Sequence, residues 1–150
     1  MLKQTLTALS LTALSASANA AELQAKAWME NALNEVLQPQ ATTQTYEKYF
    51  DPDYVQVVDG KTLDYAEATH HFGIVRDKMK SLRIVIGDFV ANGDTIAESH
   101  IVDGETREGE IVQFEVIAIT RLKDGRIWRL NELTRQIKGG EHSRDLGSRT

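Results

Sequence analysis

The chain has 150 residues, the size of one ordinary domain with a single hydrophobic core. It contains no cysteine, which excludes disulfides, thiolate metal sites and cysteine nucleophiles. Its formal net charge of −5 argues against nucleic acid or an anionic membrane as a partner, and a small neutral or cationic ligand fits this charge better.

Residues 1–20 differ in composition from the rest of the chain. Lys3 is their only charge, residues 6–18 consist of Leu, Ala, Thr and Ser, and residues 18–20 form a small-x-small site before Ala21. This layout is typical of a secretory signal peptide, and its apolar part is too short to span a membrane. The alternative is a first helix or a ragged terminus. We expect cleavage before Ala21 and a periplasmic or secreted protein.

Three helices are predicted in the first half of the chain. Apolar residues recur at helical spacing over residues 23–37. A short helix follows over about residues 43–50, capped by Thr42 or its neighbour and ended by an Asp-Pro pair. Asp64, with a glutamate three residues later, forms an acidic variant of the capping box and predicts a helix over residues 65–79.

The remaining elements are predicted strands. The first ends at an Asp-Gly turn, and four more follow as a meander; their ranges are 54–58, 83–90, 95–102, 110–122 and 126–137. This order predicts an α+β domain over residues 21–138, in which a sheet covers its apolar face with the helices. Residues 139–150 are rich in Gly, Arg and Asp, and we expect them to form a polar tail at the surface.

The last two strands turn at Asp124 and Gly125, a type I′ signal because both central residues of that turn need a positive φ. If Lys123 pairs with Arg126, the next pairs are Arg121 with Trp128, Ile119 with Leu130, Ile117 with Glu132 and Glu115 with Thr134. Glu132 then lies among apolar side chains, where it must be paired, hydrogen-bonded, protonated or open to a cavity. We therefore predict a pocket lined by Ile117, Ile119, Trp128 and Leu130.

The element order and two short motifs resemble the SnoaL-like branch of the nuclear-transport-factor-2-like superfamily. The motifs are residues 49–54, Tyr-Phe-Asp-Pro-Asp-Tyr, and the closing hairpin in which Asp-Gly-Arg-Ile leads to residues 131–134, Asn-Glu-Leu-Thr. The resemblance covers residues 23–138. It implies a cone, in which a curved antiparallel sheet wraps around the helices and encloses a pocket. Members include polyketide cyclases, ketosteroid isomerase-like enzymes, dehydratases and domains that bind a ligand or dimerise, so the fold by itself decides little about function.

The resemblance also implies roles for particular residues. Tyr54 matches an aromatic residue at the pocket side of the first strand, His71 a histidine on a helix, and Glu132 an acidic position near the end of the last strand. Val57 departs from the pattern, because many relatives carry a histidine there. Relatives often dimerise through the outer sheet face, which in the predicted register carries Phe114, Val116, Leu122, Ile127 and Leu133.

Glu98 and His100 are two residues apart in a predicted strand and therefore share a face. A second turn signal at Asn92 and Gly93 places His100 opposite Val85 and Glu98 opposite Gly87. Two interpretations remain open: a solvated ion pair on the outer face, or a pocket histidine that acts as a general base.

Two functional hypotheses follow from these residues. The chain is either a domain that binds a small apolar or weakly polar ligand, or a cofactor-free isomerase, cyclase or dehydratase. In the second case His71, His100 and Glu132 form the acid-base set and Tyr54 donates a hydrogen bond; a packing role for His71 is equally compatible with its pattern. No metal site is expected, because suitable ligand spacing is lacking. Convergence of these side chains on one enclosed cavity would favour the enzyme.

Overall fold

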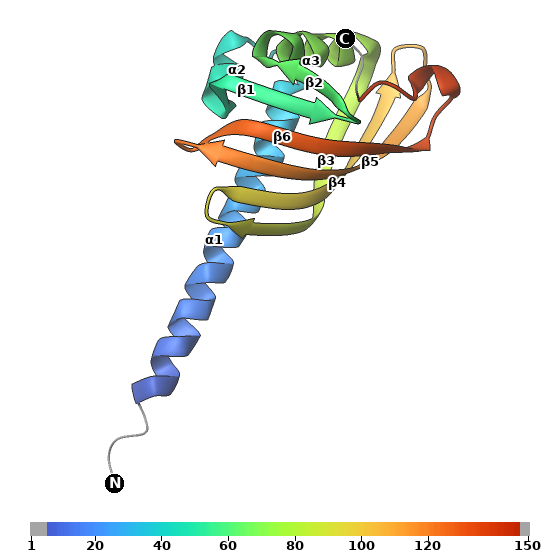
Figure 1. Cartoon of the computed structure of the whole chain (residues 1–150). Coiled ribbons are helices and arrows are strands. Elements are labelled where there is room, and N and C mark those ends of the chain that lie inside the picture. Colours follow the sequence, from blue (N-terminus) through green and yellow to red (C-terminus); the bar gives the residue numbers. More distant parts are fainter. Residues whose placement is uncertain (1–5, 148–150) are drawn as a thin grey trace.

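The computed structural model describes residues 6–147, with side chains from residue 18 onward, and it confirms the α+β class (Figure 1). Three helices accompany a six-stranded sheet in the described chain. The elements are α1 (Leu6–Val36), α2 (Thr43–Tyr49), β1 (Phe50–Val58), β2 (Lys61–Asp64), α3 (Tyr65–Lys78), β3 (Met79–Asn92), β4 (Thr95–Thr106), β5 (Ile111–Lys123), β6 (Arg126–Lys138) and a 3-10 turn (Glu141–Ser143).

The sheet is strongly curved and has the strand order β2-β1-β6-β5-β4-β3. Neighbouring strands run antiparallel except β1 and β6, which run parallel and join the early hairpin to the meander. The short strand β2 was not predicted. Because β1 and β6 run parallel, the sheet is mixed rather than purely antiparallel. It nevertheless forms the predicted cone with the helices on its concave side.

The second half of α1 packs against the sheet, mainly against β3. Met29, Ala32, Leu33 and Val36 are buried at spacings of three and four residues, as one helix face requires. The first half of the helix projects away from the domain (Figure 1). The expected cleavage site before Ala21 falls within α1, and cleavage stays a prediction. In the described part of the chain, none of the helices combines the length and apolar character needed to cross a membrane.

The predicted caps of α2 and α3 are present. The Asp64 side chain accepts a hydrogen bond from the Glu67 amide at 2.9 Å, and Glu67 accepts one from the Asp64 amide at 3.0 Å. Thr42 and Thr45 form a similar box at the start of α2. These reciprocal bonds satisfy amides that the first turn of a helix leaves unpaired, and they hold α3 above the concave face.

The hairpin turn between β5 and β6 has the predicted geometry, but the predicted register beyond it is wrong. Asp124 and Gly125 have φ values of 51° and 75°, and Lys123 pairs with Arg126. A bulge at Trp128 then shifts every later pair by one residue, and because side chains alternate along a strand, this shift exchanges the two faces of β5. The observed pairs are Arg121 with Arg129, Ile119 with Asn131, Ala118 with Glu132, Ile117 with Leu133, Val116 with Thr134 and Glu115 with Arg135.

The turn between β3 and β4 also differs from the prediction. Asn92 pairs with Thr95, so Gly93, with a φ of 58°, and Asp94 form the turn. A bulge between Ile86 and Phe89 follows, and His100 therefore lies opposite Ile86 rather than Val85, with Glu98 opposite Phe89 rather than Gly87.

The C-terminal segment packs against the domain, contrary to the expected surface tail. Leu146 is 5% exposed and contacts the apolar cluster of Val75, Met79, Val112 and Phe114. Glu110 holds this segment through three groups: the Gly140 amide, the Ser143 hydroxyl at 2.5 Å and the His142 ring nitrogen at 2.9 Å. Leu146 is one apolar residue among polar ones, and it is buried because it packs into this apolar cluster beside the cavity.

The turn between β5 and β6 provides a direct test of the hairpin. A Cβ atom at Gly125 would meet open space, so Gly125→Val should destabilise the fold through backbone strain alone, on the order of 1 kcal/mol or more. Asn131→Val, on the exposed face of β6, is the control and should change the free energy of unfolding by less than about 0.5 kcal/mol. Urea denaturation measures both variants, and equal stability for the two would contradict the positive-φ turn.

Candidate functional site

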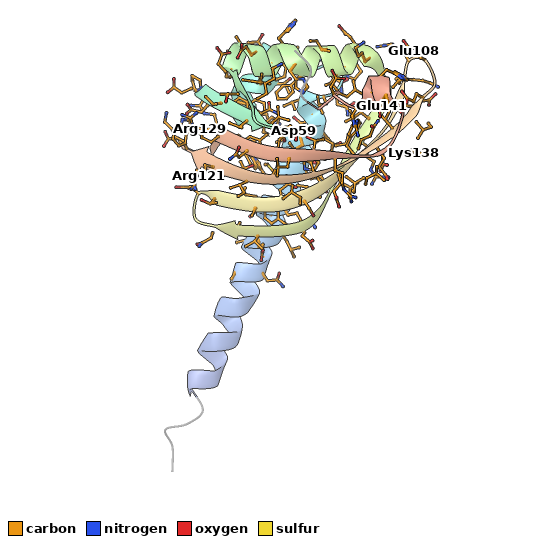
Figure 2. All side chains as sticks on the ribbon, turned by 45° about the vertical axis from the view of Figure 1, so that its right-hand side comes forward. Asp59, Glu108, Arg121, Arg129, Lys138 and Glu141 are labelled. Atoms are coloured by element: carbon orange, nitrogen blue, oxygen red, sulfur yellow. The ribbon has the colours of Figure 1, made fainter. Side chains whose placement is uncertain are left out.

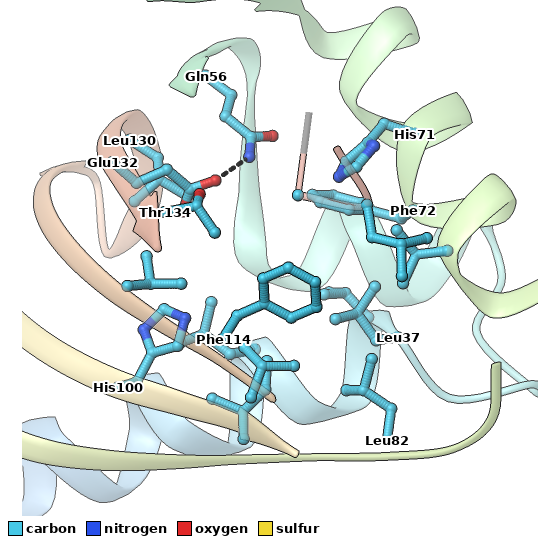
Figure 3. Close-up of a pocket in the computed structure, with 18 of the residues that line it drawn as sticks. Leu37, Gln56, His71, Phe72, Leu82, His100, Phe114, Leu130, Glu132 and Thr134 are labelled. Atoms are coloured by element: carbon cyan, nitrogen blue, oxygen red, sulfur yellow. Dashed lines mark hydrogen bonds between the residues drawn. The ribbon is translucent and has the colours of Figure 1, made fainter. Parts of the chain in front are cut away.

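A cavity of about 110 Å³ lies between the concave sheet face and the helices (Figure 3). Most of its wall is apolar. The apolar side chains come from α1, α3 and the strands, and the C-terminal segment closes one side; they are Leu33, Val36, Leu37, Phe50, Phe72, Val75, Met79, Leu82, Ile84, Val102, Val112, Phe114, Val116, Leu130 and Leu146.

Five polar side chains also line this cavity. They come from four elements: Gln56 from β1, His71 from α3, His100 from β4, and Glu132 and Thr134 from β6. The structure thus brings His71, His100 and Glu132, the predicted acid-base set, to one cavity, as Figure 3 shows. Their catalytic role stays a prediction.

Glu98 and His100 form a buried pair on the concave face of β4. His100 Nδ1 lies 2.9 Å and 3.0 Å from the two carboxylate oxygens of Glu98, and both side chains are almost fully enclosed. The interpretation as a solvated ion pair on the outer face is therefore wrong. Because the carboxylate accepts a hydrogen bond from Nδ1–H, Nε2 is the ring nitrogen left to accept a proton. Glu98 itself lies behind His100, outside the cavity lining.

Glu132 accepts a hydrogen bond from Gln56 Nε2 at 2.6 Å. Burial raises the pKa of the Glu132 carboxyl to about 7, because the apolar surroundings disfavour its charged form. The bond from Gln56 and the nearby His100 act in the opposite direction, whereas the charges of Glu98 and Asp59 raise this pKa further. A carboxyl group in this state exchanges its proton near neutral pH.

Gln56 was missed by the sequence analysis, although a signal was present. Tyr54, Gln56 and Val58 alternate along β1, and all three side chains point to the concave side and are buried. Val57, at the position where relatives carry a histidine, points the other way. A strict period of two from Tyr54 would have identified Gln56 as the polar residue of this strand.

The predicted ligand-binding residues are placed differently by the structure. Leu130 lines the cavity, as expected. Ile117 and Ile119 lie on the convex face and are 61% and 49% exposed, because the bulge at Trp128 exchanges the faces of β5. Trp128 itself lies outside the cavity lining, half-buried, with the guanidinium of Arg129 at 4.6 Å from its ring. Arg121, which the predicted register paired with Trp128, donates to Thr95 instead.

Tyr54 is fully buried behind the cavity wall, with its ring 4.4 Å from that of Phe50. Its hydroxyl has no hydrogen-bond partner among the described residues. Burial and the nearby charge of Glu132 both raise the pKa of this hydroxyl well above its usual range. Tyr54 therefore keeps its proton at neutral pH, and it is not a residue of the cavity wall. No group of three or more described His, Asp and Glu side chains could hold a metal ion.

The cone and the cavity on its concave side define the class of protein. The sequence model of the SnoaL-like domain matches residues 25–130, and the chain belongs to the SnoaL-like family. An uncharacterised protein of Schizosaccharomyces pombe is 36% identical over 100 residues, which cover 67% of this chain and 77% of that protein.

Solved structures show the same fold at low sequence identity. The candidate polyketide cyclase IdmH from Streptomyces antibioticus has a TM-score of 0.58 at 14% identity, covering 69% of this chain and 89% of that one. An LEH-like epoxide hydrolase from M. tuberculosis has a TM-score of 0.55 at 15% identity, covering 71% and 81%. Both similarities concern the fold alone.

The raised pKa of Glu132 predicts a pH dependence of stability. The folded chain holds this proton more tightly than the unfolded chain, in which the carboxyl titrates near 4.5. The resulting stabilisation is complete below pH 4.5 and is lost as the pH rises through 7. Between pH 5 and pH 8 the wild type should lose on the order of 2 kcal/mol from this group, and Glu132→Gln should remove that loss.

Urea denaturation at the two pH values measures this effect. Glu115→Gln is the matched control, because Glu115 is a carboxylate paired with Arg135 on the convex face. Its pH dependence should match that of the wild type. Identical pH dependence in all three proteins would show that Glu132 titrates as an ordinary surface carboxylate.

Proposed function

We propose that this chain binds a small, mainly apolar molecule in the cone cavity and transfers a proton on it with its own side chains, in a reaction of the isomerase, cyclase or dehydratase kind. One observation carries the proposal: a carboxylate-oriented histidine and a carboxyl group with a pKa of about 7 line the same apolar cavity. Binding is the part that both functional hypotheses share.

The arrangement supplies a base and an acid for one substrate. His100 Nε2 takes a proton from a carbon next to a carbonyl group, and the electron pair left behind moves onto the carbonyl oxygen. Glu98 stabilises the positive charge that the imidazole ring gains. Protonated Glu132 donates its proton to the developing oxyanion or, in a dehydration, to a departing hydroxyl. The apolar wall excludes water, which strengthens both interactions.

The cavity limits the size and polarity of the ligand. A closed, dry protein cavity of about 150 Å³ admits benzene, so a partly open cavity of about 110 Å³ fits a ligand of about one ring, with part of the molecule at the open side. The polar groups of β1, β4 and β6 are available to one polar substituent, and the apolar wall to a hydrocarbon ring. Two fold neighbours are described as a candidate polyketide cyclase and an epoxide hydrolase, which is compatible with chemistry on a small organic molecule.

The proton transfer is tested with cyclohexanone, because exchange of its α-hydrogens for deuterium requires only a base and an acid. In D₂O near neutral pH, followed by proton NMR, the wild type should accelerate the exchange. His100→Gln should reduce the acceleration by about 10²-fold or more, the contribution of a positioned general base. His70→Gln, an exposed histidine on α3, is the control and should leave it unchanged. Binding of cyclohexanone without accelerated exchange would contradict catalysis and would support the alternative hypothesis of a domain that only binds a ligand.

We further propose that the convex sheet face pairs two copies of the chain. Ile117 and Leu133 are direct neighbours there, 61% and 67% exposed, with Ile119 and Ile137 beside them. Arg121 and Arg129 lie at one end of this sheet and Lys138 at the other (Figure 2). An apolar patch with a charged rim is suited to a two-fold contact. Of the residues expected on this face, Leu133 is exposed there, whereas Phe114, Val116, Leu122 and Ile127 face inward.

Light scattering at micromolar concentration tests this contact. The wild type should be a dimer, and Leu133→Lys should be a monomer, because a two-fold contact would bring two buried charges together. Val90→Lys places the same charge on the exposed edge strand β3, outside the patch, and should leave the dimer intact. A monomeric wild type would contradict the interface.

A further inference from the structure

Gln56 lines the cavity and carries a buried polar atom that has no hydrogen-bond partner in the described part of the chain. The side chain is 2% exposed and donates from Nε2 to Glu132, whereas its Oε1 atom has no hydrogen-bond partner among the described residues. Figure 3 shows this oxygen pointing away from Glu132, toward the side of the cavity where His71 lies. A buried acceptor without a donor is unfavourable, so a ligand that brings a donor to this atom completes the site.

The protonation state of Glu132 determines which orientations of the Gln56 amide are possible. An ionised carboxylate can only accept hydrogen bonds, so Gln56 must present Nε2 to it. A protonated carboxyl can donate its O–H to Oε1, which is possible once the amide turns by about 180° about its terminal bond. Nε2 then faces the cavity in place of Oε1.

We propose that Gln56 is the specificity-determining residue of this site, and that it selects hydroxyl ligands when Glu132 is ionised and carbonyl ligands when Glu132 is protonated. The proposal rests on the proposed function, because it requires that a small molecule occupies the cavity. To the proposed function it adds the polar substituent that the ligand carries and the residue that recognises this substituent.

The charged groups around Glu132 permit both states. His100 on β4 favours the ionised carboxylate, whereas Glu98 on β4 and Asp59 in the turn after β1 favour the protonated form. Tyr54 approaches from β1, His71 lines the cavity from α3, and β5 contributes Ala118, which does not titrate, directly opposite Glu132. With a pKa of about 7 for Glu132, both forms are populated near neutral pH.

The two orientations of the Gln56 amide suit the proposed reaction. A ketone substrate accepts a hydrogen bond from Nε2 while Glu132 still holds its proton. Glu132 then turns its O–H from Oε1 to the substrate oxygen and donates the proton there as His100 Nε2 takes the α-proton. The substrate becomes an enol, and the amide can turn so that Oε1 accepts the new hydroxyl. The residue that binds the substrate thereby also binds the product of the proton transfer.

Cyclohexanol and cyclohexanone are matched probes, because they share a ring and differ in the polar group. Binding to the full chain is measured by ligand-observed NMR at pH 5.5 and pH 8.5. We expect cyclohexanone to bind about 3–10-fold more tightly at pH 5.5 and cyclohexanol about 3–10-fold more tightly at pH 8.5, the range for one neutral hydrogen bond. Glu132→Gln should make the preference independent of pH, and Gln56→Met should abolish it at both pH values while nearly preserving the cavity volume.

The outcomes separate the two proposals. Binding of both probes with the same preference at both pH values would overturn the role of Gln56 and leave the ligand site standing. Binding of neither probe at either pH would overturn the proposed function, and this inference with it. NMR of the wild type tests the amide directly, whether or not the variants fold: the Gln56 side-chain amide protons should contact Glu132 at pH 8.5 and lose that contact at pH 5.5. Contacts that stay the same would overturn the inference.

Discussion

The bulge at Trp128 is the constraint on which the site and the outer surface both depend. By adding one residue to β6, it places Ala118, rather than Ile117, opposite Glu132, and Val116, rather than Glu115, opposite Thr134. The small side chain opposite Glu132 leaves room for a cavity, and the displaced isoleucines form the apolar patch of the convex face. A hairpin of the same sequence without the bulge would fill the cavity and bury the patch.

Inside the cone, ionisable groups are accommodated in pairs. Glu98 holds His100, and Gln56 holds Glu132, each through a hydrogen bond shorter than about 3 Å. Pairing lowers the desolvation cost of each group, but for Glu132 it does not remove it, as the raised pKa shows. The raised pKa of Glu132 has two consequences. It lowers the free energy of unfolding at neutral and alkaline pH, and it allows the carboxyl group to give and take a proton near neutral pH.

One side of the cavity is closed by the C-terminal segment. Leu146 reaches the cavity wall, and Glu110 holds the preceding residues through their backbone and side chains. The burial of Ser143, one partner of Glu110, and of Leu146 makes this segment part of the domain rather than an appendage. The cavity therefore has walls from both ends of the folded chain: α1 on one side and residues 146 and 147 on the other.

Local patterns in the sequence determined the helix caps, the positive-φ turn at Asp124 and Gly125, and the shared face of Glu98 and His100, because each depends on residues within a few positions of one another. The element order determined the α+β class and, through the resemblance, the cone. Only the tertiary structure decided which face of β5 is buried, because β5 carries apolar residues on both faces and a single bulge in its partner strand selects between them. The pairing of Gln56 with Glu132 was likewise beyond local patterns, since β1 and β6 meet as parallel neighbours 76 residues apart in the chain.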